Sequence, residues 1–146
     1  MRGDPNRMKI VQYSLLCLTA CLAWTLCAEP HGAANVEVLA KTDQMWDGSP
    51  LPNYPTENPE ITILKVTIPA KTELPMHKHP VINAGYLLSG ELTVVSESGD
   101  ELFLKGGDTL IELVDKWHYG KNEGEEDVEI IVFYAGEKDR PITVKK

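Results

Sequence analysis

The sequence predicts an all-β domain, and three observations lead to this prediction. From residue 60 onward apolar and polar residues alternate with a period of two, first over 61–68, and β-branched residues are frequent. Glycine, serine and aspartate recur between the alternating runs, where tight turns between strands need them. No part of this region has the spacing of an amphipathic helix. Many short strands at even spacing indicate a sandwich or a barrel.

The expected elements follow one another along the chain. The first part, up to residue 59, is polar and rich in proline and asparagine, with one short strand near 35–39. Trp46 and Tyr54 lie among its turns, and we expect them to cover one end of the barrel. The strands are then expected at 61–68, 73–77, 84–89, 91–96, 101–105, 108–113, 117–119, 128–135 and 142–145.

The first 28 residues have the features of a targeting segment. Three basic residues precede a mostly apolar run over 10–27, and Ala28 follows as a small residue before a polar stretch. We expect cleavage near Ala28, which would release a periplasmic or secreted protein. Two alternatives remain open, lipidation at Cys21 within a Leu-Thr-Ala-Cys sequence and retention of the segment as a membrane anchor.

The rest of the chain is expected to form an N-terminal arm, 29–59, and a barrel domain, 60–146. A chain of 146 residues is sufficient for one such domain. All three cysteines lie in the leader, so we expect neither a disulfide framework nor a cysteine metal ligand after residue 28. The net charge of −8 argues against nucleic acid as a partner.

Three of the four histidines point to a metal site. His77 and His79 are separated by one residue, and on a strand such positions project from the same face. Two imidazoles are a poor filling for an apolar core, because their ring nitrogens need partners. They suit a transition metal, and His118 from a neighbouring strand would complete a set of three ligands.

The segment around this pair resembles the first sequence motif of the cupin superfamily. That motif runs H-x-H, three or four residues, a glutamate, six residues and a glycine. Here His77-Lys78-His79 is followed by three residues, then Asn83, six further residues and Gly90. Asn83 therefore stands where the family has its glutamate ligand, and it offers only a neutral amide oxygen. We expect Asn83 to be either a weak fourth ligand or a group that supports the ligands.

The following segment resembles the second cupin motif. Gly107-Asp108 opens it, and His118 with Asn122 closes it. Leu113 and Asp115 replace the proline and glycine of the family's P-x-G, a change that we expect to alter only a turn. Asn122 is expected to stabilise a turn.

The resemblance implies a double-stranded β-helix, the jelly-roll barrel of the cupins. It also implies that His77, His79 and His118 bind a divalent transition metal, Fe, Mn, Ni or Zn. Small cupins often pair, so a homodimer is expected, although the sequence does not show which strand would form the contact.

Two further side chains are candidates for catalysis. Tyr86 is a candidate proton donor if its side chain reaches the pocket. Glu112 precedes His118 by an even number of positions, so on a continuous strand both side chains would project from the same face. Glu112 would then be an inward carboxylate and a candidate general base. A solvated glutamate is the alternative.

The implied function is the binding or conversion of a small oxygenated or acidic molecule. With three neutral histidines the metal would keep its full charge, which favours an anionic or chelating ligand. Two reaction types are expected, oxygen-dependent cleavage and metal-assisted isomerisation or elimination, and the scarcity of acidic side chains favours the first. The alternative is a metal- or ligand-binding module without catalysis.

Overall fold

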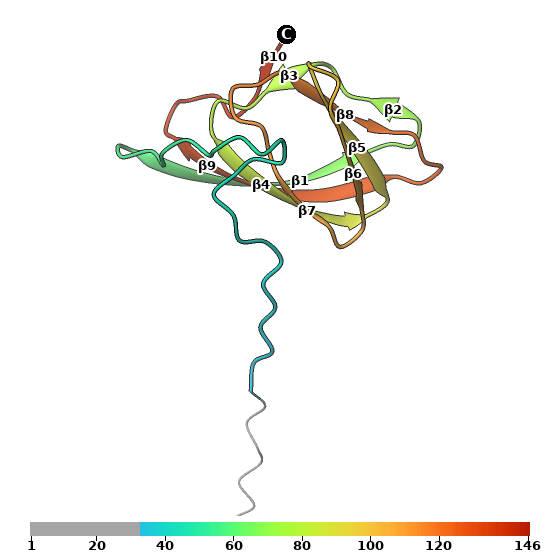
Figure 1. Cartoon of the computed structure of the whole chain (residues 1–146), viewed down its shortest axis with the longest axis horizontal. Coiled ribbons are helices and arrows are strands. Elements are labelled where there is room, and N and C mark those ends of the chain that lie inside the picture. Colours follow the sequence, from blue (N-terminus) through green and yellow to red (C-terminus); the bar gives the residue numbers. More distant parts are fainter. Residues whose placement is uncertain (1–32) are drawn as a thin grey trace, which may run out of the picture. The chain divides into compact units, whose positions relative to one another are not determined.

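A computed structural model describes residues 33–146, and within this range the chain forms ten β-strands and no helix (Figure 1). The strands are β1 (Pro59–Ile68), β2 (Thr72–Glu73), β3 (His77–Lys78), β4 (Ile82–Ser89), β5 (Glu91–Ser96), β6 (Glu101–Lys105), β7 (Thr109–Ile111), β8 (His118–Asn122), β9 (Val128–Glu137) and β10 (Val144–Lys145). The predicted leader, 1–28, lies outside the described residues. The all-β prediction is confirmed.

Within residues 33–146 no helix is long and apolar enough to cross a bilayer.

The strands form two antiparallel sheets. One has the order β1-β9-β4-β7, and the other has the order β10-β3-β8-β5-β6, with β2 also paired to β8. In Figure 1 the first sheet runs across the lower part of the domain and the second across its upper part and right side. Each sheet joins strands that are distant in sequence, as expected for a jelly-roll barrel.

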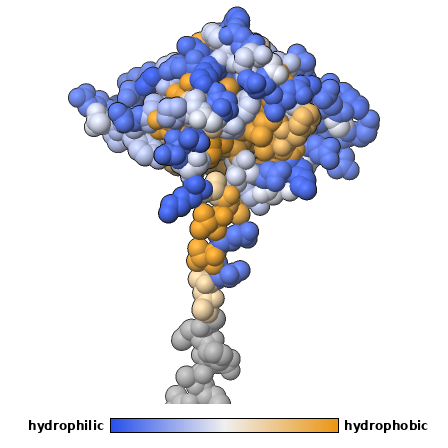
Figure 2. All heavy atoms as spheres, in the orientation of Figure 1, coloured by the Kyte–Doolittle hydropathy of each residue, from blue (hydrophilic) through white to orange (hydrophobic). Residues whose placement is uncertain are grey.

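Alternation along the strands places the core between the sheets. In β4, for example, Asn83, Gly85 and Leu87 are buried while the residues between them are only half-buried. The core cluster consists of Ile68, Val81, Leu87, Leu92, Val94, Leu104, Leu110, Val128, Ile130, Val132 and Tyr134. The outer surface is largely polar, with a hydrophobic area in the middle of the face shown in Figure 2.

Two residues of the motifs stabilise turns that close this barrel. Gly90 has φ +82°, and a Cβ there would lie 2.9 Å from the Asp127 carbonyl oxygen, so a side chain would have no room. The buried Asn122 side chain donates from Nδ2 to three backbone carbonyls, those of Ile68, Pro69 and Glu126. The turn-stabilising role expected for Asn122 is therefore confirmed.

The segment before β1 packs partly on the barrel. Met45 forms a second, smaller cluster with Leu113 and Val114. Trp46 packs against this cluster and the core cluster, and its amide donates to the Ile111 carbonyl. The strand expected at 35–39 is wrong. Val36 and Val38 are 83 % and 71 % exposed, and no described strand pairs with this segment. The alternating apolar residues therefore have no sheet against which to bury their side chains.

Candidate metal centre

Three histidines meet because their strands are neighbours. His77 in β3 is the cross-strand partner of His118 in β8, which places both side chains on one face. His79 follows β3 and is held by a parallel bridge to Val114. Ring centroids lie 4.7 Å apart for His77 and His118, and 5.0 and 5.1 Å from His79 to these two. One nitrogen of each ring lies within 4.8 Å of the other two.

Hydrogen bonds fix the tautomer of each ring. Nδ1 of His77, His79 and His118 lies 2.8 Å, 2.8 Å and 2.9 Å from a backbone carbonyl oxygen, respectively those of Pro75, Ile142 and Lys116. A carbonyl can only accept, so each Nδ1 must carry the proton and donate it. Nε2 therefore keeps a free lone pair on all three rings, and this is the arrangement in which a histidine binds a metal.

Burial keeps these rings neutral. Desolvation lowers the pKa of His77 and His118 below the ordinary value, and it lowers the pKa of His79 to about 4, more strongly than the hydrogen bonds to the carbonyls raise these values. The Nε2 lone pairs are thus available at neutral pH. The Nε2 of His118 is buried and has no hydrogen-bond partner within the described part of the chain.

A buried carboxylate stands beside His118. Oε2 of Glu112 lies 3.4 Å from Nε2 of His118, and the glutamate is only 8 % exposed. Desolvation raises the pKa of Glu112 to about 7, although the Leu113 amide, which donates to Oε2, partly opposes this. The solvated alternative for Glu112 is therefore wrong, and the inward orientation inferred from its phase with His118 is correct.

The histidines form part of the wall of a cavity of about 340 Å³ between the two sheets. Its polar lining comes from the three histidines, Glu112, Tyr134, Thr143 and Lys145, and the remaining walls are almost entirely aliphatic. This volume is in the range of small-molecule sites. A ligand in it would contact the histidines directly.

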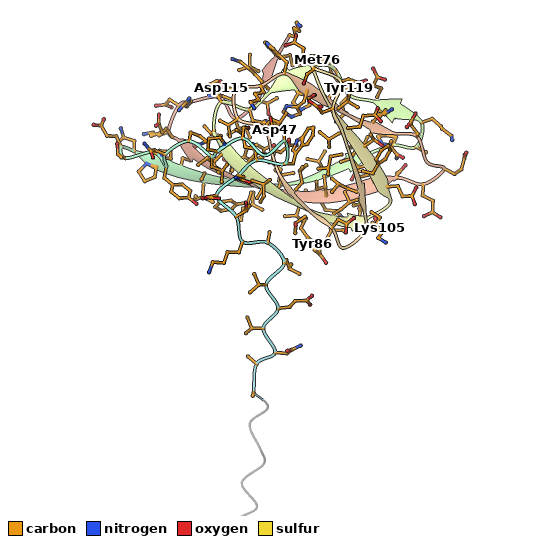
Figure 3. The ribbon with its side chains drawn as sticks, in the orientation of Figure 1. Asp47, Met76, Tyr86, Lys105, Asp115 and Tyr119 are labelled. Atoms are coloured by element: carbon orange, nitrogen blue, oxygen red, sulfur yellow. The ribbon has the colours of Figure 1, made fainter. Side chains whose placement is uncertain are left out.

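The other two sequence candidates lie elsewhere. Tyr86 is on the outer side of β4, and Figure 3 shows its side chain at the lower edge of the domain, so the expectation that it reaches the pocket is wrong. The reason is parity, because residues 83, 85 and 87 face inward. Asn83 is fully buried, and its backbone carbonyl accepts from the Glu112 amide, yet it does not line the cavity. A ligand role for Asn83 stays a prediction.

The substituted turn of the second motif keeps the backbone shape that a glycine would give. Asp115, labelled in Figure 3, has φ +56°, and its amide donates to the His79 carbonyl oxygen. Aspartate tolerates this left-handed conformation better than most residues. The expectation that only a turn is altered agrees with this geometry.

Residues that the sequence analysis missed come from β9 and the C-terminal segment. The ring of Tyr134 lies 5.5 Å from that of His79, and the Thr143 hydroxyl is 3.2 Å from Nδ1 of His79. Burial raises the pKa of Tyr134 to about 12, so its hydroxyl stays protonated. A tyrosine in phase with Ile130 and Val132 was the available signal, because a polar tip in an aliphatic run needs a partner.

The donor set fits a divalent transition metal. Three neutral imidazoles with free Nε2 atoms and an adjacent carboxylate match the ligands of Fe, Mn, Ni and Zn sites. The partnerless buried Nε2 of His118 is an observation that such an ion would explain.

Comparison with known proteins bears on the fold. A family model described as "Cupin domain" matches residues 64–134. The comparison of the sequence with curated proteins found no match.

Several solved structures are similar. The DMSP lyase DddQ from Ruegeria pomeroyi has a TM-score of 0.53 at 20 % identity, covering 68 % of this chain and 47 % of the lyase. An uncharacterised protein with a double-stranded β-helix domain from Klebsiella pneumoniae has a TM-score of 0.52 at 18 % identity, covering 64 % of this chain and 88 % of that one. The oxalate decarboxylase of Lactobacillus farciminis has a TM-score of 0.51 at 20 % identity, covering 58 % and 26 %. This chain thus spans about half of the lyase and about a quarter of the decarboxylase, and the likeness concerns the fold.

Proposed function

Because this chain belongs to the cupin superfamily and gathers three histidines on the wall of a cavity, we propose that it is a metal-dependent enzyme for a small oxygenated acid. The reaction that we favour is a proton transfer of the isomerase or lyase type. The observation that supports it best is the Glu112 carboxylate, 3.4 Å from Nε2 of His118 inside the same cavity.

The roles of the residues follow from their positions. His77, His79 and His118 would hold the ion, Fe, Mn, Ni or Zn, through Nε2. When bound, such an ion supplies positive charge that polarises a ligand oxygen and acidifies a neighbouring proton. Glu112 lies where it can accept that proton, and the aliphatic walls exclude water from the reacting part of the ligand.

This carboxylate also changes the balance between the two reaction types. The scarcity of acids in the sequence favoured oxygen chemistry, because Glu112 was the one acidic candidate for a base and a solvated side chain was its alternative. A buried glutamate beside the histidines supplies such a base, so proton transfer becomes the preferred chemistry.

Deuterium exchange tests this function without knowledge of the substrate. The metal-loaded protein would be incubated in D₂O with a panel of small 2-hydroxy and 2-oxo acids, and loss of the proton next to the carboxylate or carbonyl would be followed by NMR. We expect exchange with at least one acid, no exchange in His77→Ala, and a loss of about 100-fold or more in Glu112→Gln. Tight binding of acids without any exchange would instead favour a non-catalytic binding module. Oxygen consumption by the Fe²⁺ form would favour oxygen chemistry.

A homodimer is part of the proposal. On the outer face of the four-stranded sheet, Ile63 and Phe133 are cross-strand neighbours and are 64 % and 40 % exposed, with Ile61 beside them. Exposed apolar side chains in one contiguous group are typical of protein contacts. A second copy of the chain would cover this group face to face.

Export to the periplasm or to the medium is also proposed, on the basis of the leader sequence. Mass spectrometry of the N-terminus in periplasmic and membrane fractions tests it. A new N-terminus after Ala28 supports cleavage, and a lipid-modified Cys21 or an intact leader would support one of the membrane-bound alternatives.

A further inference from the structure

The cavity at the histidines is polar at one end and aliphatic at the other. Along β9, Tyr134 lies near His79, and Val132 and Ile130 follow at successive inward positions. Along β5, Ser96 is the cross-strand partner of His118. Val94 and Leu92 are the next residues on the same side of β5, and both line the cavity. Four residues of strand correspond to roughly 13 Å, so the cavity wall that β9 forms extends about this far from the histidines.

A glycine forms part of the cavity wall. Gly120 faces inward on β8, two residues beyond His118, and a Cβ there would lie 3.3 Å from a methyl group of Leu92 and 3.5 Å from one of Leu74. Any larger side chain at residue 120 would enter the space between these leucines. The two leucines, which line the cavity, therefore already fill the space beside Gly120, and a side chain there would press them into the cavity.

Of the described residues that line the cavity, Lys145 is the one lysine or arginine. It is the cross-strand partner of His77, so its side chain projects from the same face as that histidine. Lys145 forms no ion pair with any acidic side chain of residues 33–146. The next residue, Lys146, differs, because it pairs with Glu97 and lies over the Trp117 ring on the other face.

From this arrangement we propose that the cavity binds an unbranched aliphatic monocarboxylate. The carboxylate would lie between Lys145 and the histidines, and the hydrocarbon chain would extend between the sheets past Gly120. Lys145 is exposed at the rim of the cavity, so it can meet an anionic head group there without first breaking an ion pair with a described side chain. This inference adds an unbranched aliphatic chain to the oxygenated acid of the proposed function, and it rests on that function for the location of the ligand.

Isothermal titration of the full chain tests the proposal, with octanoate, butanoate and 1-octanol as probes at pH 6. The titrations are made on the metal-free protein and on the Zn²⁺-loaded protein. We expect octanoate to bind more tightly than 1-octanol, which lacks the carboxylate. It should also bind more tightly than butanoate, by about threefold or more for each methylene by which its chain is longer. Lys145→Met should weaken octanoate about tenfold and leave 1-octanol within twofold, because only the charged head group loses its partner.

Matched variants separate the head group from the chain. Lys146→Met removes the neighbouring lysine, whose side chain points away from the cavity, and should leave octanoate binding unchanged. Gly120→Val should abolish the advantage of octanoate over butanoate, and circular dichroism would verify the fold of each variant. The proposal is overturned if octanoate binds no more tightly than 1-octanol, or if Lys145→Met and Lys146→Met have equal effects.

The same titrations distinguish this inference from the proposed function. Octanoate binding by a protein that takes up no Zn²⁺ would support the inference while contradicting the metal site. Zn²⁺ uptake without any octanoate binding would overturn the inference and leave the metal site in place.

Discussion

Replacing Glu112 by glutamine should stabilise the metal-free protein at alkaline pH and leave it unchanged in acid. Burial raises the pKa of Glu112 from 4.5 to about 7. Above pH 7 the carboxylate is ionised in both the folded and the unfolded chain, and only the folded chain bears the cost of burying the charge. The separation between 4.5 and about 7, at about 1.4 kcal/mol for each pH unit, corresponds to about 3 kcal/mol of unfolding free energy.

The sign of this effect is fixed by proton linkage. A group whose pKa is raised on folding binds more protons in the folded state, so its contribution to stability is lost as pH rises from 4.5 to 7. Glutamine does not ionise, and its side-chain oxygen can still accept from the Leu113 amide. The advantage of Glu112→Gln is therefore expected to be near zero at pH 4 and to reach about 3 kcal/mol at pH 8.

Urea unfolding followed by tryptophan fluorescence, in the presence of EDTA, measures this difference. Glu91→Gln, which changes an exposed glutamate at the start of β5, is the matched control and should alter stability equally at both pH values. The reasoning is refuted if Glu112→Gln and the wild type differ by the same amount at pH 4 and pH 8. It is also refuted if the variant is the less stable protein at pH 8.

Three further outcomes are expected. The histidine pKa values are lowered, that of His79 to about 4, so a bound metal should survive stepwise dialysis to about pH 5; release already near pH 6.5 would contradict this. Thr143→Val removes the hydroxyl 3.2 Å from Nδ1 of His79 and should weaken Zn²⁺ binding up to about tenfold in competition with a chelator, whereas an unchanged affinity would exclude a role for this contact. Phe133→Asp should convert a dimer to a monomer in sedimentation, while Phe103→Asp, on the exposed face of β6, should not; a monomeric wild type would argue against the proposed contact.

The sequence was sufficient for the fold and for the grouping of the histidines. Alternation over the strands and the two motifs contain the necessary information, because side-chain direction on a strand follows from parity alone. The same rule applied to Asn83 and Gly85 would have excluded Tyr86 from the pocket. The strand expected at 35–39 failed because alternation does not show whether a partner strand is available.

Other parts of the site depend on contacts that no local pattern encodes. The carbonyl of Ile142 and the hydroxyl of Thr143 orient His79 across 63 and 64 residues of sequence. Lys145 reaches the cavity only because β10 pairs with β3. Burial of Glu112 likewise depends on the two sheets closing over its side chain. The even spacing between residues 112 and 118 indicated that this side chain points inward, but it did not indicate that the carboxylate is desolvated.

The central claim is that His77, His79 and His118 bind one divalent metal ion, and metal content tests it most directly. The chain would be purified without a metal-affinity tag and analysed for elements, beside the variant His77→Ala/His79→Ala/His118→Ala. We expect one ion per chain in the wild type and none in the variant, with circular dichroism verifying that both are folded. The absence of metal from both proteins, even after reconstitution with Fe²⁺, Mn²⁺, Ni²⁺ or Zn²⁺, would contradict the claim.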